Sequence, residues 1–353
     1  MALSLSPETF LVEEMLPDST VLEKGKQYNF GEERCQQWQR DYFSHFVLQK
    51  ENWTTHAALE EMARKLGVKP SRFDFAGSKD RNATTTQLCS GFAIAPERLM
   101  GLQIKDVSIN GCWKAKKKVK LGQLAGNRFT MLLEKNNCGV VPDVEAMKEK
   151  ALQNSFLFPN YFGEQRFGSM RHNSHLVGEL LAKGDVQGAV MNFLCFVGER
   201  EQKESTEARK KLSAEKDFGA ALGYFPQSLS PERKMLAWLA AHENDYAGAY
   251  RTMHRAMQLL FVHAYQSFAF NKTLFEMGEN AEKNGEEIFL EKLEVASFPE
   301  LSSEGTTRKT FAKMESFSCD QEGEGVVLRF SLQAGSYATV AAEWLLGTLQ
   351  PFC

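Results

Sequence analysis

The chain has 353 residues, 43% of them hydrophobic and 25% charged, a composition typical of globular proteins at a length that allows two domains. Nowhere do about 18 apolar residues follow one another, which excludes a transmembrane helix. The first residues have neither the basic nor the apolar part of a signal peptide. We therefore expect a soluble, cytoplasmic protein, and the sequence leaves its oligomeric state open, with a monomer as the starting assumption.

The cysteines and histidines favour no metal site. No two cysteines have the C-x-x-C spacing of a zinc ribbon or a redox dithiol. The seven are Cys35, Cys89, Cys112, Cys138, Cys195, Cys319 and Cys353. Their odd number and wide spacing favour free thiols in a reducing compartment. His172 and His175 lie three residues apart, but no carboxylate pattern completes a metal set, and we expect both on a helix surface.

Positive charge is concentrated in one segment although the net charge is −3. Residues 61–130 contain 14 Lys or Arg and 5 Asp or Glu. A basic segment on an acidic background is typical of a localised phosphate-binding face. The same pattern also occurs on a solvated surface without function, so charge alone does not decide between the two.

The first part of the chain predicts an α+β fold. A helix is expected over residues 52–66, where apolar residues recur at helical spacing, Thr54 or Thr55 caps the start and Gly67 caps the end. Strands are expected at residues 10–14, 41–48, 73–75, 84–95, 104–109 and 128–133. Helices and strands alternate irregularly, which favours α+β over a doubly wound parallel sheet.

From about residue 145 the pattern becomes helical, and strands return after residue 310. Helices are expected at residues 144–154, 174–183, 186–197, 205–212, 231–241 and 247–274. A strand is expected at 326–332 and a last helix at 337–349. This order suggests a helical domain inserted within an α+β catalytic domain.

The most informative stretch is FDFAGSKDRNATTTQLCS at residues 73–90. Asp80 follows a strand in a loop of small residues, between Lys79 and Arg81. Flanking cations favour the carboxylate form, which suits a nucleophile or an electrostatic role. Lys79 or Arg81 could also bind an RNA phosphate. The tripeptide by itself also fits a charged surface turn.

The stretch KLGQLAGNRF at residues 120–129 follows a run of lysines. Phe129 could stack on an unpaired base while Asn127 binds its edge. Alternatively, Phe129 belongs to the core and Asn127 to a turn. We expect phosphate contacts from Lys114, Lys116, Lys117, Lys118 and Lys120. Trp113 and Lys114 could equally lie on a solvated strand edge.

A third stretch, PNYFGEQRFG at residues 159–168, predicts a compact turn with three aromatic residues and Arg166. Its polar groups could brace a neighbouring loop. The chain contains no Gly-rich phosphate loop, no nucleophile elbow and no Rossmann fingerprint.

Together and in this order, these motifs resemble the TruD family of pseudouridine synthases. The matching runs are PETFLVEE at 7–14, FAGSKDRNATTTQ at 75–87, LGQLAGNRF at 121–129, PNYFGEQRFG at 159–168, HAYQSFAFN at 263–271 and GSYATVAAEWL at 335–345. The resemblance implies isomerisation of a uridine in tRNA, typically uridine 13 near the D stem, without cofactor or metal. It implies that Asp80 attacks the nucleoside, that Phe129 stacks on the base, and that Asn127 lies near Asp80.

The resemblance also implies an architecture. A mixed, largely antiparallel sheet flanked by helices would form a catalytic pseudouridine synthase domain from residues 1–153 and 312–353. A mainly helical TRUD-type domain would be inserted at residues 154–311.

Two positions depart from the family pattern. Ser4 stands where some relatives carry Lys, and Thr9 replaces the usual acidic residue. The basic partner of Asp80 is therefore unassigned, with Lys79, Arg81 and Arg166 as candidates. Two rival hypotheses are a catalytically silent tRNA-binding or RNA-folding protein on the same fold, and an Asp-dependent hydrolase, for which Glu164 would be the second carboxylate.

Overall fold

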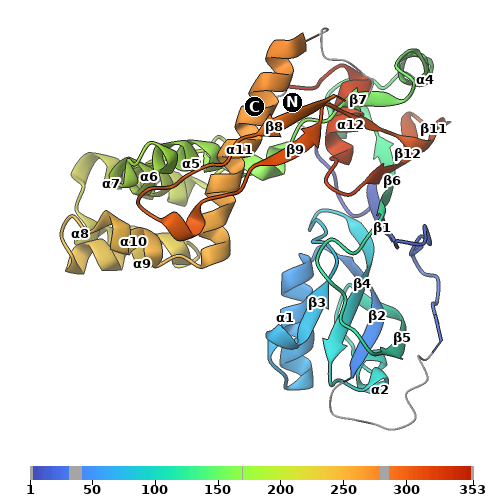
Figure 1. The fold of residues 1–353 in the computed structure, drawn as a ribbon, viewed down its shortest axis with the longest axis horizontal. Coiled ribbons are helices and arrows are strands. Elements are labelled where there is room, and N and C mark those ends of the chain that lie inside the picture. Colours follow the sequence, from blue (N-terminus) through green and yellow to red (C-terminus); the bar gives the residue numbers. More distant parts are fainter. Residues whose placement is uncertain (1–2, 32–41, 169, 279–285, 351–353) are drawn as a thin grey trace. The chain divides into compact units, whose positions relative to one another are not determined.

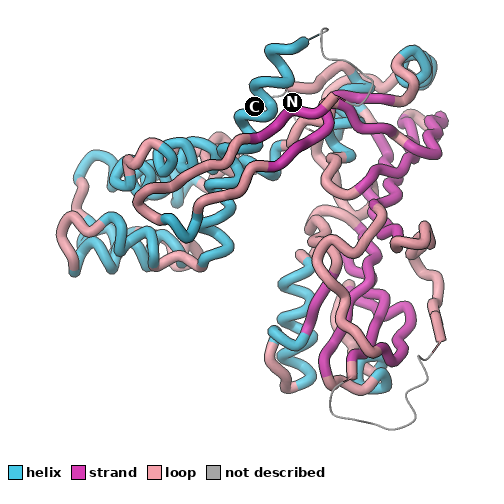
Figure 2. Tube along the Cα trace, viewed as in Figure 1, coloured by secondary structure: helices cyan, strands magenta, loops and turns pink. Residues whose placement is uncertain are grey.

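A computed structural model of the chain describes residues 3–31, 42–168, 170–278 and 286–350 (Figure 1). The chain divides into two compact units. Unit 1 comprises residues 1–158 and 312–349, and unit 2 comprises residues 159–311 and 350–353. Strands are concentrated in unit 1 and helices in unit 2 (Figure 2). The catalytic and TRUD-type roles assigned from the sequence to the two parts stay predictions.

Unit 1 is built on an eight-stranded mixed sheet of the order β11-β12-β6-β1-β4-β2-β5, with β3 also paired to β4. Its strands are β1 (Phe10–Met15), β2 (Phe43–Glu51), β3 (Phe73–Phe75), β4 (Thr84–Phe92), β5 (Val107–Ala115), β6 (Gly126–Leu133), β11 (Glu315–Glu322) and β12 (Gly325–Gln333). The β1–β4 pair is parallel, and the other recorded pairs are antiparallel. The α+β class and the mixed, largely antiparallel sheet predicted from the sequence are confirmed.

Strand β2 shows why the sheet needs a cover on both faces. Successive side chains point to opposite faces, so Phe46 and Leu48 lie on one face and Val47 on the other. Phe46 and Leu48 pack in a core cluster with Met62 of helix α1 (Thr55–Leu66), whereas Val47 packs with Trp113. Lys50 follows Phe46 and Leu48 at alternate positions, which places it on the α1 face.

Helix α1 has the caps that the sequence predicts, although it begins at Thr55 and not at residue 52. The Thr54 side chain accepts a hydrogen bond from the Ala57 N–H, and Gly67 ends the helix with a left-handed φ of 66°. The other helices of unit 1 are α2 (Pro96–Met100), α3 (Lys135–Cys138), α4 (Val144–Gln153) and α12 (Ala338–Leu346), with a 3-10 turn at Pro70–Arg72. Helix α12 is shorter than the predicted 337–349 because Gly347, with a φ of 72°, ends it.

Unit 2 is mainly helical and has its own core. Its helices are α5 (Ser174–Ala182), α6 (Val186–Cys195), α7 (Lys203–Glu215), α8 (Phe218–Tyr224), α9 (Ser230–Ala241), α10 (Tyr246–Arg251) and α11 (Arg255–Met277), with 3-10 turns at Glu164–Phe167 and Pro299–Leu301. Val177, Phe193, Leu236 and Phe261 belong to one buried cluster that these helices share. The sequence analysis missed α8.

The predicted single helix over 247–274 is wrong, because the chain forms α10 and α11 with a break between them. Gln258 Nε2 donates to the carbonyls of Tyr250 and Met253 at 3.2 and 2.9 Å, and so satisfies acceptors that the break leaves open. His254 caps α11, with its side chain accepting from the Ala256 N–H at 3.3 Å. Apolar spacing continues across the break, so periodicity could not detect it.

Several strands differ from the prediction. Strand β2 runs to Glu51, and Asp41 of the predicted strand lies outside the described residues. Strand β5 begins at Val107 instead of residue 104. The strands missed by the sequence analysis are β7 (Leu157–Pro159), β8 (Glu287–Leu290), β9 (Thr306–Lys309), β10 (Phe311–Lys313) and β11. β11 is an edge strand with mostly exposed polar side chains and so lacks an alternating apolar signal.

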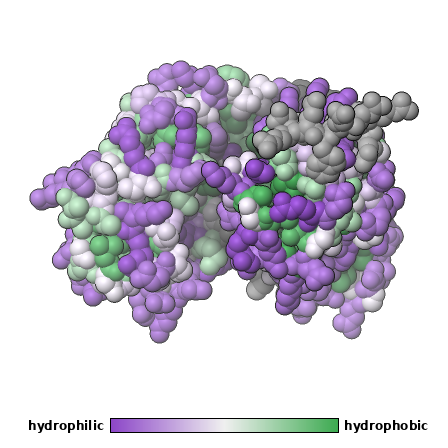
Figure 3. Space-filling view, turned by 90° about the horizontal axis from the view of Figure 1, so that it is seen from below, coloured by the Kyte–Doolittle hydropathy of each residue, from purple (hydrophilic) through white to green (hydrophobic). Residues whose placement is uncertain are grey.

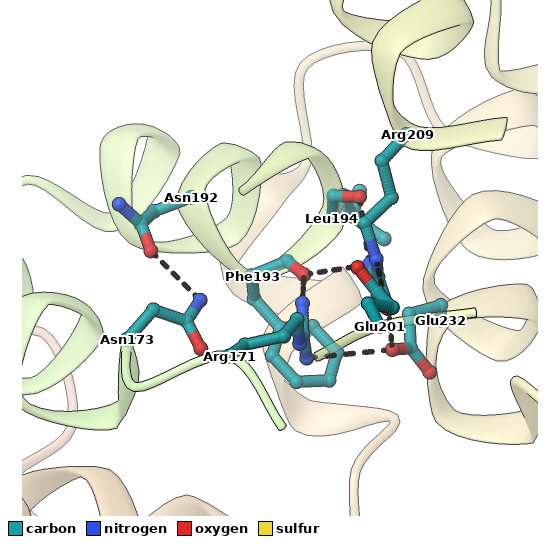
Figure 4. A network of polar contacts seen from close by, with 8 residues as sticks. All are labelled: Arg171, Asn173, Asn192, Phe193, Leu194, Glu201, Arg209 and Glu232. Atoms are coloured by element: carbon teal, nitrogen blue, oxygen red, sulfur yellow. Dashed lines mark hydrogen bonds and ion pairs between the residues drawn. The ribbon is translucent and has the colours of Figure 1, made fainter. Parts of the chain in front are cut away.

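A buried ionic network joins four segments of unit 2 (Figure 4). The Arg209 guanidinium donates to Glu201 Oε1 and Glu232 Oε1, both at 2.7 Å, and to the carbonyls of Phe193 and Leu194 at 3.1 and 2.9 Å. Arg171 donates to the Phe193 carbonyl at 2.6 Å. Burial lowers the pKa of Arg171 to about 10, with the nearby Arg209 charge as a second cause. The network ties α6, α7 and α9 together through charges that water cannot reach.

No helix of the described residues is long and apolar enough to cross a membrane. On the face drawn in Figure 3, hydrophilic residues cover most of the surface, with smaller hydrophobic areas between them.

Replacing Arg209 with Met should destabilise unit 2 by about 3–5 kcal/mol, because Glu201 and Glu232 would then be buried without their cation. Urea unfolding followed by circular dichroism measures the loss. The neighbouring, exposed Lys210→Met on the same helix is the matched control and should unfold at the midpoint of the unsubstituted protein. Equal midpoints for the two variants would show that the network adds no stability.

Candidate active site

Asp80 lies in the loop between β3 and β4, the position that the sequence predicts. Its side chain is partly exposed, and the neighbouring Arg81 is exposed. The guanidinium of this exposed Arg81 donates through Nε to the Asn52 carbonyl at 3.3 Å. Asp80 therefore sits where a ligand from solvent can reach it.

Lys50 fixes the backbone of this loop. Its fully buried ammonium donates to the carbonyls of Trp53, Asp80 and Lys79 at 2.6, 2.8 and 3.4 Å. Since an ammonium has three N–H donors, each finds an acceptor. Burial lowers the pKa of Lys50 to about 8, while the negative charge of Asp80 acts in the opposite direction. Lys50 thus joins the end of β2 to Asp80 through a charged contact away from water.

Lys79 turns inward and pairs with a buried carboxylate. Its Nζ lies 2.5 Å from Glu14 Oε2 of β1, and the two side chains are 4% and 0% exposed. The other oxygen of Glu14 accepts from the Leu88 N–H at 3.0 Å. We therefore reassign Lys79, expected among the substrate contacts, to support of the loop, because its ammonium has a partner and almost no exposure.

Two neutral side chains complete the support. Thr55 Oγ1 accepts from the Lys79 N–H at 2.9 Å and donates to Gln87 Oε1 at 2.8 Å. Gln87 Nε2 donates to the Gly77 carbonyl at 3.1 Å. Polar groups from α1 and β4 therefore hold both ends of the segment Gly77–Lys79.

Asn127 and Phe129 lie on β6, on the sheet face that carries Glu14. Asn127 is directly opposite Glu14, and directly opposite residues of an antiparallel pair share a face. Among the described residues, Asn127 Oδ1 is buried without a hydrogen-bond partner. Because Glu14 contacts Lys79, the unpaired amide oxygen lies close to the Asp80 loop. Asn127 is a strand residue, so the alternative that placed it in a turn is wrong.

Phe129 packs among aromatic neighbours. Its ring centroid lies 6.0 Å from that of Phe10 in a stacked arrangement and 5.7 Å from that of Phe330. The residue is 6% exposed, so in this arrangement the ring contributes an apolar wall more than an open stacking platform.

The lysine run begins on edge strand β5 and continues into a loop. Lys114 is half-buried on β5, whereas Lys116, Lys117, Lys118 and Lys120 are exposed. Lys118 Nζ lies 3.0 Å from Asp74 Oδ1. Trp113, in contrast, is buried against Phe30 and His45. The alternative that placed both Trp113 and Lys114 on a solvated strand edge is therefore wrong for Trp113.

In unit 2, the runs at 159–168 and 263–271 meet. Asn271, fully buried on α11, accepts from the Phe162 N–H at 2.8 Å and donates to the Phe162 carbonyl at 3.0 Å. The Arg308 guanidinium lies 4.0 Å from the Phe162 ring centroid and donates to Asn160 Oδ1 at 2.7 Å. The turn predicted from the aromatic and glycine pattern is thus fixed from two sides.

Arg166 belongs to the same turn. Its Nε donates to Ser267 Oγ at 3.0 Å, which leaves the end of the guanidinium for other partners. Glu164 Oε1 lies 2.9 Å from His172 Nε2 and 2.8 Å from Arg200.

The two histidines are not helix-surface residues. His172 precedes α5 with a positive φ of 53°, and His175 stacks on Phe268 with ring centroids 4.5 Å apart. Burial lowers the pKa of His175. Among the described residues, no group of three or more His, Cys, Asp or Glu side chains is arranged to hold a metal.

Sequence reasoning missed the supporting residues Glu14, Lys50, Thr55 and Gln87. A signal was present for two of them. Glu14 and Lys50 are each the second-to-last residue of a strand, at a position that the alternating pattern assigns to a covered face. A charge at such a position is almost always paired, but the pattern does not identify the partner.

Comparisons with known proteins define the family. The model of the TruD family, described as tRNA pseudouridine synthase D, matches residues 1–283 and 278–343. A protein of Methanococcus maripaludis named probable tRNA pseudouridine synthase D is 30% identical over 97% of this chain and 94% of its own. One of Methanocaldococcus jannaschii is 35% identical over 77% of this chain and 68% of its own. The crystal structure of a TruD protein from Methanosarcina mazei matches with a TM-score of 0.69 and 25% identity, covering 99% of this chain and 95% of that one.

The fold and the family match are those of a pseudouridine synthase. The chain belongs to the TruD family of tRNA pseudouridine synthases.

Replacing Lys50 with Met should lower the rate of pseudouridine formation by about 100-fold, since small displacements of a reacting group are that costly. In the unsubstituted protein the rate should fall as the pH rises through about 8, where Lys50 loses its proton. Single-turnover rates between pH 7 and 9.5 measure both effects. Lys65→Met, which removes an exposed lysine bonded to the Gln103 carbonyl, is the control.

The contribution of Lys50 to stability should move in the opposite direction. Its pKa in the folded protein, about 8, lies below the ordinary 10.5, so between these values the unfolded chain binds the proton that the folded chain has released. The stability of the unsubstituted protein relative to Lys50→Met should therefore rise with pH. A parallel fall of activity and relative stability would contradict a positioning role.

Proposed function

We propose that this chain isomerises a uridine of tRNA to pseudouridine with Asp80 as the attacking carboxylate. The observation that carries the proposal is the Asp80 loop, whose backbone is held by the buried Lys50 while the Asp80 side chain remains partly exposed. A nucleophile held in this way loses little freedom when the substrate binds.

The reaction exchanges one bond to the ribose for another. The Asp80 carboxylate attacks C1′ and forms a bond to it while the bond between C1′ and N1 of the uracil breaks. The base turns, C5 attacks C1′, and the Asp80 carboxylate leaves as the bond between C1′ and C5 forms. The proton on C5 is lost and N1 gains one, so the product is an isomer of the substrate and no co-reactant enters. The detached uracil must remain in a closed, partly apolar pocket throughout.

Asn127 and Phe129 supply two properties that such a pocket needs. The Oδ1 of Asn127 accepts no hydrogen bond from the described residues. It can therefore accept one from the N3–H of uracil. Phe129, between Phe10 and Phe330, forms the apolar wall. Both lie on the sheet face next to the Lys79–Glu14 pair.

The RNA backbone contacts are assigned to exposed cations. Arg81 lies beside the catalytic loop, and the loop after β5 carries four exposed lysines, Lys116, Lys117, Lys118 and Lys120. Arg166 of unit 2 bonds to Ser267 through Nε, and its terminal guanidinium nitrogens can donate to phosphate. Lys114, half-buried on β5, contributes at the edge of this surface.

The substrate uridine and the domain roles follow the family resemblance, and the uridine is position 13 in the D arm. The cytoplasmic location follows from the sequence composition and the scattered cysteines, and a monomer is the starting assumption. Residues 1–153 and 312–353 form the catalytic domain, and residues 154–311 form the TRUD-type domain.

Replacing Asp80 with Asn should abolish pseudouridine formation while leaving tRNA affinity within about threefold, because an amide cannot attack but has the same shape. Pseudouridine mapping of tRNA after incubation with each protein measures the first effect, and filter binding measures the second. Asp106→Asn, an exposed aspartate of the same unit with a φ of 60° that Asn also adopts, should keep full activity.

Each rival hypothesis has its own outcome. Tight tRNA binding without pseudouridine from the unsubstituted protein would favour a silent tRNA-binding or RNA-folding protein. An Asp-dependent hydrolase would release free uracil or cleave the RNA, and would need Glu164, which is already bonded to His172 and Arg200.

Changing Lys116, Lys117, Lys118 and Lys120 to Gln should flatten the dependence of log K on log salt concentration by about 3, because fewer counterions are released. Affinity measured between 50 and 200 mM salt gives the slope. The control changes four exposed lysines of unit 2, Lys203, Lys210, Lys211 and Lys216. An unchanged slope in the first variant would remove this loop from the RNA surface.

A further inference from the structure

Leu121 is an exposed apolar side chain on a polar, positively charged part of the surface. It is 81% exposed, the highest value among the large exposed apolar side chains of the described chain. Its neighbours Lys120, Gly122 and Gln123 are exposed as well, and three further lysines precede them at 116–118. A single exposed leucine is ordinary in proteins, so its meaning depends on how it is held and on what lies beside it.

The backbone holds Leu121 at the tip of a closed turn. The Gln123 N–H donates to the Lys120 carbonyl at 3.0 Å, and the Lys120 N–H donates to Gln123 Oε1 at 3.0 Å. Gly122 has a φ of 82°, as the third residue of a type II turn requires. Leu121 is the second residue of that turn, with both sides of the turn bonded to each other.

The turn is attached to the catalytic loop. The Gly122 N–H donates to the Ala76 carbonyl at 2.7 Å. A Cβ placed on Gly77 would lie 3.8 Å from Leu124 Cδ1, so the chain after the turn packs against the start of the same loop. Ala76 precedes Asp80 by four residues, which span at most about 14 Å when extended. Leu121 is therefore presented next to the start of the loop that carries Asp80.

We propose that Leu121 is the apolar wedge that enters the RNA stack in place of the extruded uridine. The proposal rests on the proposed function, since only an enzyme acting on a base needs to take that base out of a helix. Leucine is among the apolar side chains that proteins insert between base steps. The exposed lysines on the same loop bring phosphates to both sides of the turn, and Leu121 then prevents the base from returning to its stack.

The experiment measures extrusion apart from chemistry. A tRNA transcript carries 2-aminopurine next to the target uridine. The fluorescence of 2-aminopurine rises when the uridine leaves the stack. Binding to Asp80→Asn should give this rise, and the double variant with Leu121→Ala should give less than about half of it, with affinity kept within threefold by the phosphate contacts. In the background with Asp80 intact, Leu121→Ala should lower the single-turnover rate at saturating enzyme by about tenfold or more.

Two controls separate a wedge from a general surface effect. Leu152→Ala removes a leucine of α4 that is 63% exposed in the same unit and should change neither signal. Leu121→Met keeps an apolar side chain of similar length and should restore most of the rate. Unchanged unfolding midpoints confirm that all these variants are folded.

The outcomes for the wedge and for the proposed function are distinct. Pseudouridine formed by Leu121→Ala at the rate of the unsubstituted protein, with an equal fluorescence rise, would overturn the wedge alone. Absence of pseudouridine with the unsubstituted protein would overturn the proposed function itself. Loss of rate in Leu121→Met as large as in Leu121→Ala would also count against the wedge, because apolar character would then not be the property that matters.

Discussion

The position of the Asp80 loop depends on one buried cation, the ammonium of Lys50. Lys50 places a charged group where water cannot hydrate it, and the three carbonyls around it supply the compensation. An unpaired buried charge is strongly unfavourable, so any conformation that moved the Asp80 carbonyl away would leave the ammonium unsatisfied. The Lys50 ammonium and the loop thus stabilise each other. The backbone that carries the Asp80 carboxylate is fixed as a result.

Strand β1 extends this constraint to the rest of the sheet. Glu13 and Glu14 are adjacent and both buried, and they face opposite sides of the sheet. Glu14 pairs with Lys79, and Glu13 pairs with Arg128 Nε at 2.7 Å. Glu14 therefore links β1 to the Asp80 loop, and Glu13 links β1 to β6. Since Asn127 lies opposite Glu14, the same register brings the amide and the loop together.

The sequence was sufficient where local chemistry determines structure, and insufficient where partners come from far along the chain. The caps of α1, the strands around Asp80 and the place of Asp80 in a loop after a strand could be predicted from residue type and spacing, whereas the nearness of Asn127 to that loop was implied only by the family resemblance. The role of Lys50 could not be predicted, because the alternating pattern places its charge on the covered face but does not show that its acceptors come from a loop 30 positions later. The break between α10 and α11 was hidden for a similar reason, since Gln258 satisfies it from within the next helix.

In both units a buried polar side chain bonds to the backbone of a loop. In unit 1 a buried ammonium binds loop carbonyls, and in unit 2 the buried amide of Asn271 binds both polar groups of the Phe162 backbone. In each case a side chain from a regular element replaces the backbone partner that a loop lacks. Lys50 bonds to the carbonyl of Asp80 itself, and Arg166 lies four residues beyond Phe162. The side chains of Asp80 and Arg166 remain partly exposed, while side chains from regular elements fix the backbone that carries them.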